Sequence, residues 1–314
     1  MGKSERKTNK RSIIIIIILS LGILALSYFT VINYYKFQDE TKNNKELNQK
    51  LNEVTNNKNK ITEINNSLLS QIQELENTEN TILETKNEVF KLASQVETKI
   101  KNKETNYKIA YITFDDGPYY LTDTIIATLK KYKVKATFFT IGLNKDKCFD
   151  NQKYSCAETY KKIVDNGHTI ANHTYSHLIF NGLYNNVDSF ITQVKKQEEL
   201  IKNRTGVTTN ILRFPGGAST AAYYGVKNGA ITKLKEMGYG WVDWTAQDGD
   251  GGSLNSYDVG WRNFTGSINE NIEVVLFHDY NKTTASLLPK AIEYLESKNY
   301  ILLPLFYESV MINK

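Results

Sequence analysis

From Asn106 onward, short apolar segments rich in β-branched and aromatic residues alternate with amphipathic ones, and this alternation restricts the fold more than any other feature. Over about 200 residues, such a pattern predicts an α/β barrel or a doubly wound parallel sheet. The expected strands cover residues 109–114, 136–141, 169–171, 211–214, 240–244, 274–277 and 301–304. The expected helices cover residues 122–132, 157–166, 187–203, 227–237 and 285–298.

The N-terminal region predicts a membrane anchor. Residues 12–35 contain no charged side chain, which satisfies the length of about 20 residues that a membrane-spanning helix needs. The basic residues of the 1–11 tail precede this segment, so the tail is expected in the cytoplasm and the rest outside the cell. A cleaved signal peptide is the alternative, although its apolar region would be shorter. Either way, the remainder is exported.

Residues 37–105 contain no Gly or Pro and predict a coiled-coil stalk. An unbroken column of apolar residues recurs every seventh position from Leu47 to Val96, as expected for one seam of a heptad repeat. The matching column from Leu51 to Ile100 is half polar, so the coil is weak or selects register and partner. We expect a parallel homodimer that holds the C-terminal domain away from the membrane. A flexible tether is the alternative.

The positive charge of the chain is concentrated at its start. Residues 1–11 hold five of the 39 Lys and Arg residues but one of the 34 Asp and Glu residues, so the rest is nearly neutral. A nucleic-acid-binding domain would carry a basic excess, and nucleic acid is therefore not expected as a partner.

The two cysteines, Cys148 and Cys156, lie eight positions apart in a polar segment that is expected to form a loop. In an exported domain, a disulfide between them is favoured. Two free thiols are the alternative, and neither has the neighbours of a catalytic nucleophile.

Polar side chains gather where the expected strands end, which is where active sites of parallel α/β folds lie. Asp115 and Asp116 close the first strand, and because adjacent residues of an extended chain point in different directions, the two carboxylates can take different tasks. His173 and His177 have an i, i+4 spacing, which predicts two imidazoles on one side of a helical turn, as in a metal chelate.

Three further residues complete this set of polar candidates. His278 ends a later apolar strand, whereas His168 fits a packing or hydrogen-bonding role better than that of a metal ligand. Arg213 lies at another strand end before a Pro-Gly-Gly turn, and it suits the orientation of a carboxylate.

Five segments in this order resemble the motifs of the polysaccharide deacetylases, the family 4 carbohydrate esterases. They are TFDDGP at 113–118, HTYSH at 173–177, RFPGG at 213–217, DWTAQDGD at 243–250 and LFHD at 276–279. The resemblance covers about residues 106–305 and is greatest to membrane-bound peptidoglycan N-acetylglucosamine deacetylases. It implies a distorted (β/α) barrel with fewer than eight regular strands, in a catalytic domain at 106–314.

This resemblance implies a metal centre with a base beside it. Asp116, His173 and His177 would be the ligands of a divalent ion, Asp115 the general base, and Arg213 the group that keeps Asp115 ionised and aimed. The ion is expected to be zinc, with cobalt or nickel as alternatives, because one carboxylate and two imidazoles accommodate several metals. Three protein ligands leave positions open for water and substrate.

The resemblance also implies an acid and a substrate pocket. His278 would be the general acid, and Asp250, or Asp248 in its place, would raise its pKa. The substrate-binding positions would be Gly216, through its backbone N–H at the oxyanion, and Leu276, Trp244 and Tyr175.

The chain departs from many relatives at three positions. Gly216 stands in place of a tyrosine, Gly251 in place of a tryptophan and Gln247 in place of an aspartate. The missing side chains would widen or reshape the acetyl pocket and the surface that holds the sugar.

The expected function is therefore hydrolysis of the N-acetyl group of N-acetylglucosamine in cell-wall peptidoglycan. Deacetylation of another exported glycan, such as chitin oligomers or acetylated xylan, is the first alternative. A catalytically silent wall-binding protein is the second, but such a protein would lack a ligand, base or acid, and this chain has all of them.

Overall fold

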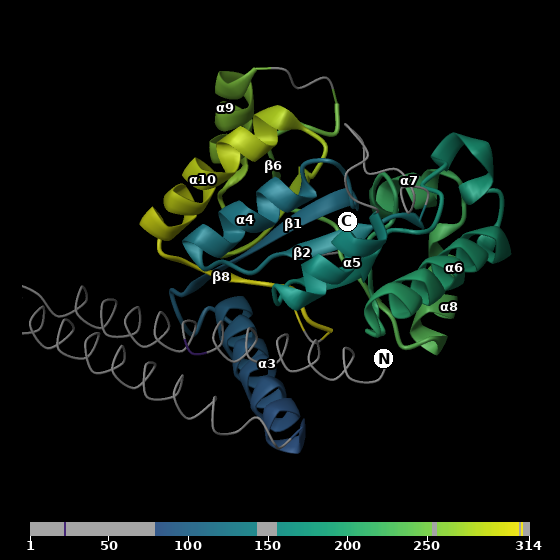
Figure 1. Cartoon of the computed structure of the whole chain (residues 1–314), viewed down its shortest axis with the longest axis horizontal. Helices are drawn as coiled ribbons and strands as arrows, with labels where there is room; N and C mark the ends of the chain where they lie inside the picture. The colour runs from purple at the N-terminus through teal and green to yellow at the C-terminus, as the bar shows by residue number, and fades with distance from the viewer. Residues whose placement is uncertain (1–21, 23–78, 143–155, 253–255, 308, 310–314) are drawn as a thin grey trace, which may run out of the picture.

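The computed structural model describes residues 22, 79–142, 156–252, 256–307 and 309 (Figure 1). The helices are α3 (Glu79–Lys101), α4 (Thr122–Tyr132), α5 (Cys156–Asp165), α6 (Val187–Thr205), α7 (Gly217–Tyr223), α8 (Lys227–Glu236), α9 (Tyr257–Ser267) and α10 (Lys282–Ser297), with a π-helical turn η2 at Ile179–Leu183. The strands are β1 (Lys108–Gly117), β2 (Thr137–Thr140), β3 (Thr169–Asn172), β4 (Ile211–Leu212), β5 (Gly240–Trp241), β6 (Ala246–Gln247), β7 (Ile272–His278) and β8 (Tyr300–Leu303).

The strands form one sheet in the order β5-β4-β3-β2-β1-β7-β6, and the described strand pairs are all parallel. Along one edge β1 pairs with β7. Its other edge is shared by β8, beside residues 108–111, and β2, beside residues 113–117. A parallel α/β fold is thus confirmed. The described residues contain eight strands, one more than the seven segments expected from the pattern, and β4, β5 and β6 have only two residues each.

The connection between β5 and β6 requires the sheet to curl. A flat sheet would place its two outermost strands about 29 Å apart, at roughly 4.8 Å per neighbouring pair. The chain from Trp241 to Ala246 can reach only about 17 Å when extended. Val242 N–H donates to Leu212 O at 3.0 Å and Thr245 N–H to Val274 O at 2.9 Å, so this connection bonds to both sides of the gap. The result is a curled, half-barrel sheet whose ends, β5 and β6, are not paired with each other.

The side chains of β1 point alternately into two hydrophobic clusters, one on each face of the strand. Ala110, Ile112 and Phe114 face outward into the cluster formed with α4, α9 and α10, which lie together in Figure 1. Ile109 and Tyr111 face inward and pack with residues of α3, β7 and β8. Because side chains alternate along a strand, Thr113 and Asp115 continue the inward face toward the carboxyl end of β1. A third cluster joins η2, α6, α7 and α8 beside β4.

Helix α3 packs against the inner core. Val96 and Ile100, both from the expected heptad seam, are buried there, and Phe90 stacks on Phe306 with ring centroids 4.8 Å apart. Within α3, these two seam residues therefore pack on the core of the domain that follows. The remainder of the expected stalk, residues 37–78, lies outside the described residues.

Two other expectations also fall outside the described residues. The expected membrane anchor at 12–35 does so except for Gly22, and among the described residues no helix is both long and apolar enough to cross a bilayer. Cys148 and the side chain of Cys156, which were expected to pair, are likewise not described.

The expected elements agree with the observed ones within a few residues, with four omissions. The turn η2, helices α7 and α9 and strand β6 were not expected. Strand β6 has two residues and forms by pairing with β7, so no local pattern marks it. Helix α7 starts at Gly217 after a left-handed Gly216, two residues that ordinarily disfavour a helix.

Candidate active site

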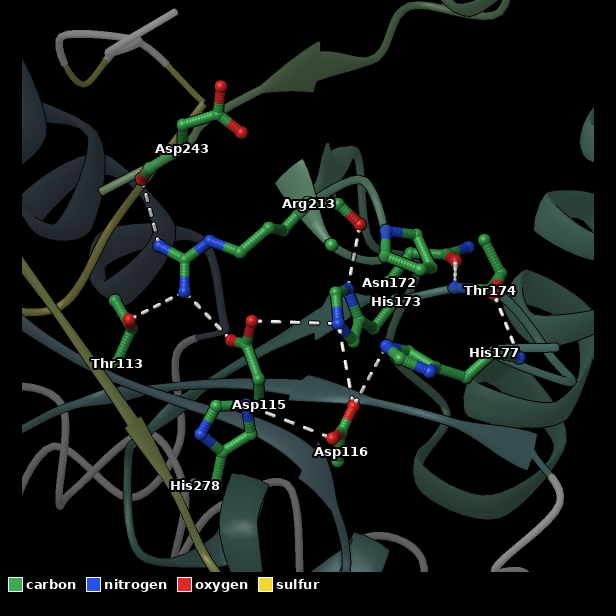
Figure 2. A network of polar contacts seen from close by, with 12 residues as sticks. Thr113, Asp115, Asp116, Asn172, His173, Thr174, His177, Arg213, Asp243 and His278 are labelled. Atoms are coloured by element: carbon green, nitrogen blue, oxygen red, sulfur yellow. Dashed lines mark hydrogen bonds and ion pairs between the residues drawn. The ribbon is translucent and has the colours of Figure 1, made fainter. Parts of the chain in front are cut away.

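A bulge at the end of β1 brings the two adjacent aspartates to one place. The pairing register with β2 shifts between Asp115 and Gly117, and Asp116 has a φ of 70°. Aspartate tolerates this left-handed conformation better than most residues, and bulges re-aim side chains next to active sites. As a result, Asp115 Oδ2 and Asp116 Oδ1 both lie 3.5 Å from His173 Nε2 (Figure 2).

His173 and His177 lie on a loop, so the expectation of a helical turn was wrong. Residues 173–178 after β3 are neither helix nor strand, and Thr174 and His177 have φ angles of 66° and 52°. The Asn172 side chain supports the turn, because its Oδ1 accepts a hydrogen bond from Thr174 N–H at 2.9 Å. A left-handed conformation is strained for the β-branched Thr174, and it nevertheless brings the two imidazole rings within 4.9 Å.

Asp116, His173 and His177 fit a divalent metal ion. Their candidate ligand atoms lie within 4.8 Å of one another, and no other such group of three is found in the part of the chain that the structure describes. His173 Nδ1 lies 2.7 Å from Arg213 O, so its N–H can donate there and leave the Nε2 lone pair directed at Asp116. Burial lowers the pKa of His173 to about 3, which keeps the ring neutral, as a metal ligand requires.

Arg213 organises the wall behind Asp115. Its guanidinium is fully buried and donates to Asp115 Oδ1 and Thr113 Oγ1, both at 2.7 Å, and to Asp243 O at 3.0 Å. Burial raises the pKa of Asp115, and the charge of Arg213 opposes that shift. A buried carboxylate with a raised pKa is a stronger base, while Arg213 fixes its direction.

His278 lies on the other side of Asp116, with its Nε2 3.8 Å from Asp116 Oδ2. Its Nδ1 lies 2.6 Å from Asp250 Oδ1, so Asp250 and not Asp248 is the carboxylate that contacts the ring. Burial disfavours the charged imidazole, but the hydrogen bond and charge of Asp250 outweigh burial and raise the pKa of His278 to about 9. A protonated ring with an aimed N–H can act as an acid near neutral pH.

The expected substrate-binding residues lie on different elements around these side chains. Leu276 is two residues before His278 on the inward face of β7 and is nearly buried. Gly216 has a φ of 71° at the start of α7, and Trp244 packs beside that turn, because a Cβ on Gly217 would lie 3.1 Å from its ring. The Tyr175 ring occupies the space beside Gly142, where it would meet any added Cβ.

Sequence reasoning assigned no role to three buried residues that support the site. Thr113 accepts a hydrogen bond from Arg213, and the Asp243 side chain accepts one from Ala218 N–H at 3.0 Å. Asp279 contacts the Thr122 hydroxyl and fills the space beside Gly117. Burial raises the pKa of Asp279 to about 7. Only their positions in the sequence could have indicated these three residues, since each lies within a few residues of an assigned site residue.

His168 is separate from this group. Its Nδ1 accepts a hydrogen bond from Ala136 N–H at 3.2 Å, its ring meets Phe138 edge to face, and burial lowers its pKa to about 3. This agrees with the expected packing role.

Comparison with known proteins identifies the chain. A sequence profile of the family described as polysaccharide deacetylase matches residues 102–240. A peptidoglycan-N-acetylglucosamine deacetylase from Bacillus cereus is 31% identical over 199 residues, which cover 62% of this chain and 67% of that protein. This chain belongs to the polysaccharide deacetylase family.

The fold of this polysaccharide deacetylase is similar to the folds of solved relatives. The catalytic domain of peptidoglycan N-acetylglucosamine deacetylase from Eubacterium rectale superposes with a TM-score of 0.60 at 30% identity, covering 66% of this chain and 92% of that one. Peptidoglycan-N-acetylglucosamine deacetylase PgdA from Listeria monocytogenes is 27% identical over 203 residues. The match spans 64% of the present polysaccharide deacetylase but only 39% of that relative.

Proposed function

We propose that this polysaccharide deacetylase hydrolyses the N-acetyl groups of N-acetylglucosamine residues in peptidoglycan and releases acetate, with a divalent metal bound by Asp116, His173 and His177. The observation that carries the proposal is the arrangement of base and acid around the ligand set. Asp115 Oδ2 is 3.5 Å from His173 Nε2, and His278 Nε2 is 3.8 Å from Asp116 Oδ2. An amide held between them would have a proton acceptor and a proton donor within reach.

The first step assigned to the protein is removal of a proton from the attacking water. A divalent ion in the site would polarise the acetyl carbonyl and make water a better nucleophile. Asp115 accepts the water proton, and Arg213 keeps its carboxylate oriented for that transfer. Developing negative charge on the acetyl oxygen would be stabilised by the backbone N–H of Gly216.

The second step is protonation of the leaving amine. His278 donates this proton from Nε2, because its Nδ1 is held by Asp250. The ring must carry its proton when the substrate is bound, and the raised pKa of His278 meets that requirement at neutral pH. Leu276 would line the space for the acetyl methyl group.

We also propose the cellular arrangement that the sequence predicts. Residues 1–11 form a cytoplasmic tail, 12–35 a transmembrane anchor, 37–105 a stalk that pairs two chains through its part before α3, and 106–314 an extracellular catalytic domain with a Cys148–Cys156 disulfide. The packing of α3 on the inner core extends the folded unit N-terminal to residue 106. Zinc is the proposed ion, and cobalt or nickel would suit the same donors.

The direct test measures acetate released by the full chain from peptidoglycan, chitin oligomers and acetylated xylan, with and without a chelator. We expect release from peptidoglycan that chelation abolishes and added metal restores, and release by Asp115→Asn that is lower by roughly 10²–10⁴-fold. Faster acetate release from chitin oligomers or xylan would mean that this glycan, and not peptidoglycan, is the substrate. Release that resists the chelator would refute the metal mechanism, and no release from any glycan would favour a silent binding protein.

A further inference from the structure

Exposed aromatic side chains are concentrated on two segments that border the site. Among the described residues, eight large hydrophobic side chains are exposed, and four of them lie on these two segments. Leu178 and Phe180, which follow His177, are 43% and 86% exposed. Tyr223 and Tyr224, at the end of α7, are 85% and 37% exposed. Exposed apolar groups gathered in this way mark binding surfaces more often than isolated ones do.

Both segments are attached directly to the site. Ile179 N–H donates to His177 O at 2.9 Å, so the segment that carries Phe180 begins at a proposed metal ligand. A Cβ on Gly216 would lie 3.1 Å from Ile179 Cδ1, which places this segment against the turn that starts α7. Phe180 lies within about 11 Å of His177 along the chain, and Tyr223 lies about 9 Å along α7 from its first residue. These lengths suit sugar rings next to the one that reacts.

The exposed Tyr223 is the outer end of a stack of aromatic rings. Its centroid is 5.2 Å from Tyr224, which is 5.7 Å from Tyr184. The stack continues through Phe190, 5.6 Å from Tyr184, to Phe214, a further 5.0 Å away in the loop after β4. The inner rings of Tyr184, Phe190 and Phe214 are buried, so Tyr224 packs on a preformed support, and Tyr223 meets Tyr224 edge to face.

The absence of charged residues from these two segments restricts the kind of ligand they can bind. Residues 177–187 and 214–226 contain no Asp, Glu, Lys or Arg, in a chain in which these make up 23% of residues. A nucleic acid or an anionic lipid surface would be matched by basic side chains. Aromatic faces beside exposed Asn181 and Ser219 suit a neutral ligand that has an apolar face and hydroxyl groups. A pyranose ring is such a ligand.

We propose that Phe180 and Tyr223 bind sugar rings of the glycan chain adjacent to the sugar being deacetylated, so that the enzyme favours long substrates. This inference rests on the proposed function, because it assigns the surface to the same substrate. Neither aromatic ring takes part in the hydrolytic steps.

The test compares N-acetylglucosamine dimers with hexamers. In Phe180→Ala/Tyr223→Ala, we expect the hexamer-to-dimer ratio of kcat/KM to fall about tenfold, through a higher KM for the hexamer, since each lost ring removes one stacking contact. The control is Val259→Ala. Val259 lies on α9, outside both segments, and its side chain is 38% exposed. A ratio equal to that of the control would overturn the proposal, as would an equal loss for dimer and hexamer.

A binding measurement separates this inference from the proposed function. Hexamer affinity is measured by calorimetry in Asp115→Asn, with and without Phe180→Ala/Tyr223→Ala. Weaker binding in the triple variant supports the aromatic surface even if the wild type releases no acetate. Unchanged affinity, together with loss of self-association in sedimentation, would assign the surface to a second copy of the chain and overturn the proposal.

Discussion

Asp250 contacts His278 twice, because one carboxylate oxygen accepts from the backbone N–H at 2.7 Å and the other lies 2.6 Å from ring Nδ1. The two contacts fix both the position of the ring and its charge. Thr284 Oγ1 lies 2.8 Å from the same carboxylate and helps to orient it. An acid held in this way should remain protonated well above neutral pH.

The first prediction concerns the alkaline limb of the pH–rate profile. Activity requires protonated His278, so it should persist to about pH 9 and fall above that value. Asp250→Asn removes the charge that raises this pKa, and the limb should move down by at least about one pH unit. The profile of kcat/KM against pH, which reports groups of the free enzyme, measures the shift. A limb at the same pH in both proteins would mean that another group is the acid.

The second prediction separates the proposed base, Asp115, from the proposed metal ligands. Asp115→Asn should retain the metal and lose turnover by roughly 10²–10⁴-fold, as expected for removal of a general base. His173→Ala should lose both, since its Nε2 is one of three ligand atoms. Metal content by mass spectrometry and acetate release on the same samples test this difference. Equal metal content in the two variants would contradict the assigned roles.

The third prediction concerns the buried ion pair. Arg213→Met leaves the Asp115 carboxylate buried without its partner, and we expect a loss of about 3–5 kcal/mol in the free energy of unfolding. In Arg213→Met/Asp115→Asn the unpaired charge is also removed, so the double variant should be more stable than the Arg213→Met single variant. Urea titration measures both values. A double variant that is less stable than Arg213→Met would show that the charge of Asp115 is not the source of the loss.

The fourth prediction uses two adjacent glycines. A Cβ on Gly251 would lie 2.9 Å from His278 Cε1, and the ring cannot yield easily because Asp250 holds it. Gly251→Ala should therefore lower kcat by about tenfold or more, as misplacement of a catalytic group does. Gly252→Ala is the matched control, since its Cβ would make an ordinary 3.6 Å contact with Gly249 O. Similar kcat values in the two variants would refute this steric account.

The fifth prediction concerns α3. Ile100 is buried against the inner core, and Ile100→Ala should cost about 2–5 kcal/mol in the free energy of unfolding. Leu92 on the same helix is 44% exposed, so Leu92→Ala should change stability by less than about 0.5 kcal/mol. Thermal unfolding of the full chain compares the variants. Matching stabilities would mean that α3 is not part of the folded unit.

The strands and most helices could be predicted because their signals are local. The apolar segment before Asp115 specifies a buried strand, and Asp115, His278 and Arg213 follow such segments directly. Carboxyl ends of parallel strands meet at one edge, so these residues were expected to lie close together, as they do.

Other parts of the site depend on contacts that no local pattern records. The loop at His173 takes its left-handed turn partly from the Asn172 side chain, so helical spacing gave the wrong local structure. The heptad pattern at Val96 and Ile100 predicts an apolar helix face that must be buried, but it does not predict which surface buries that face. In this chain the covering surface is the inner core.

The four residues between β5 and β6 have a further consequence. Because Val242 bonds to β4 and Thr245 to β7, on the two sides of the gap in the sheet, the number of residues between them is fixed more strictly than their side chains. The carbonyls of Val242 and Asp243 accept hydrogen bonds from Arg213 on one side, and Asp250 follows shortly after on the other. An insertion here would separate the arginine from the acid without altering either one, so evolutionary change in loop length should be tolerated elsewhere and not in this crossing.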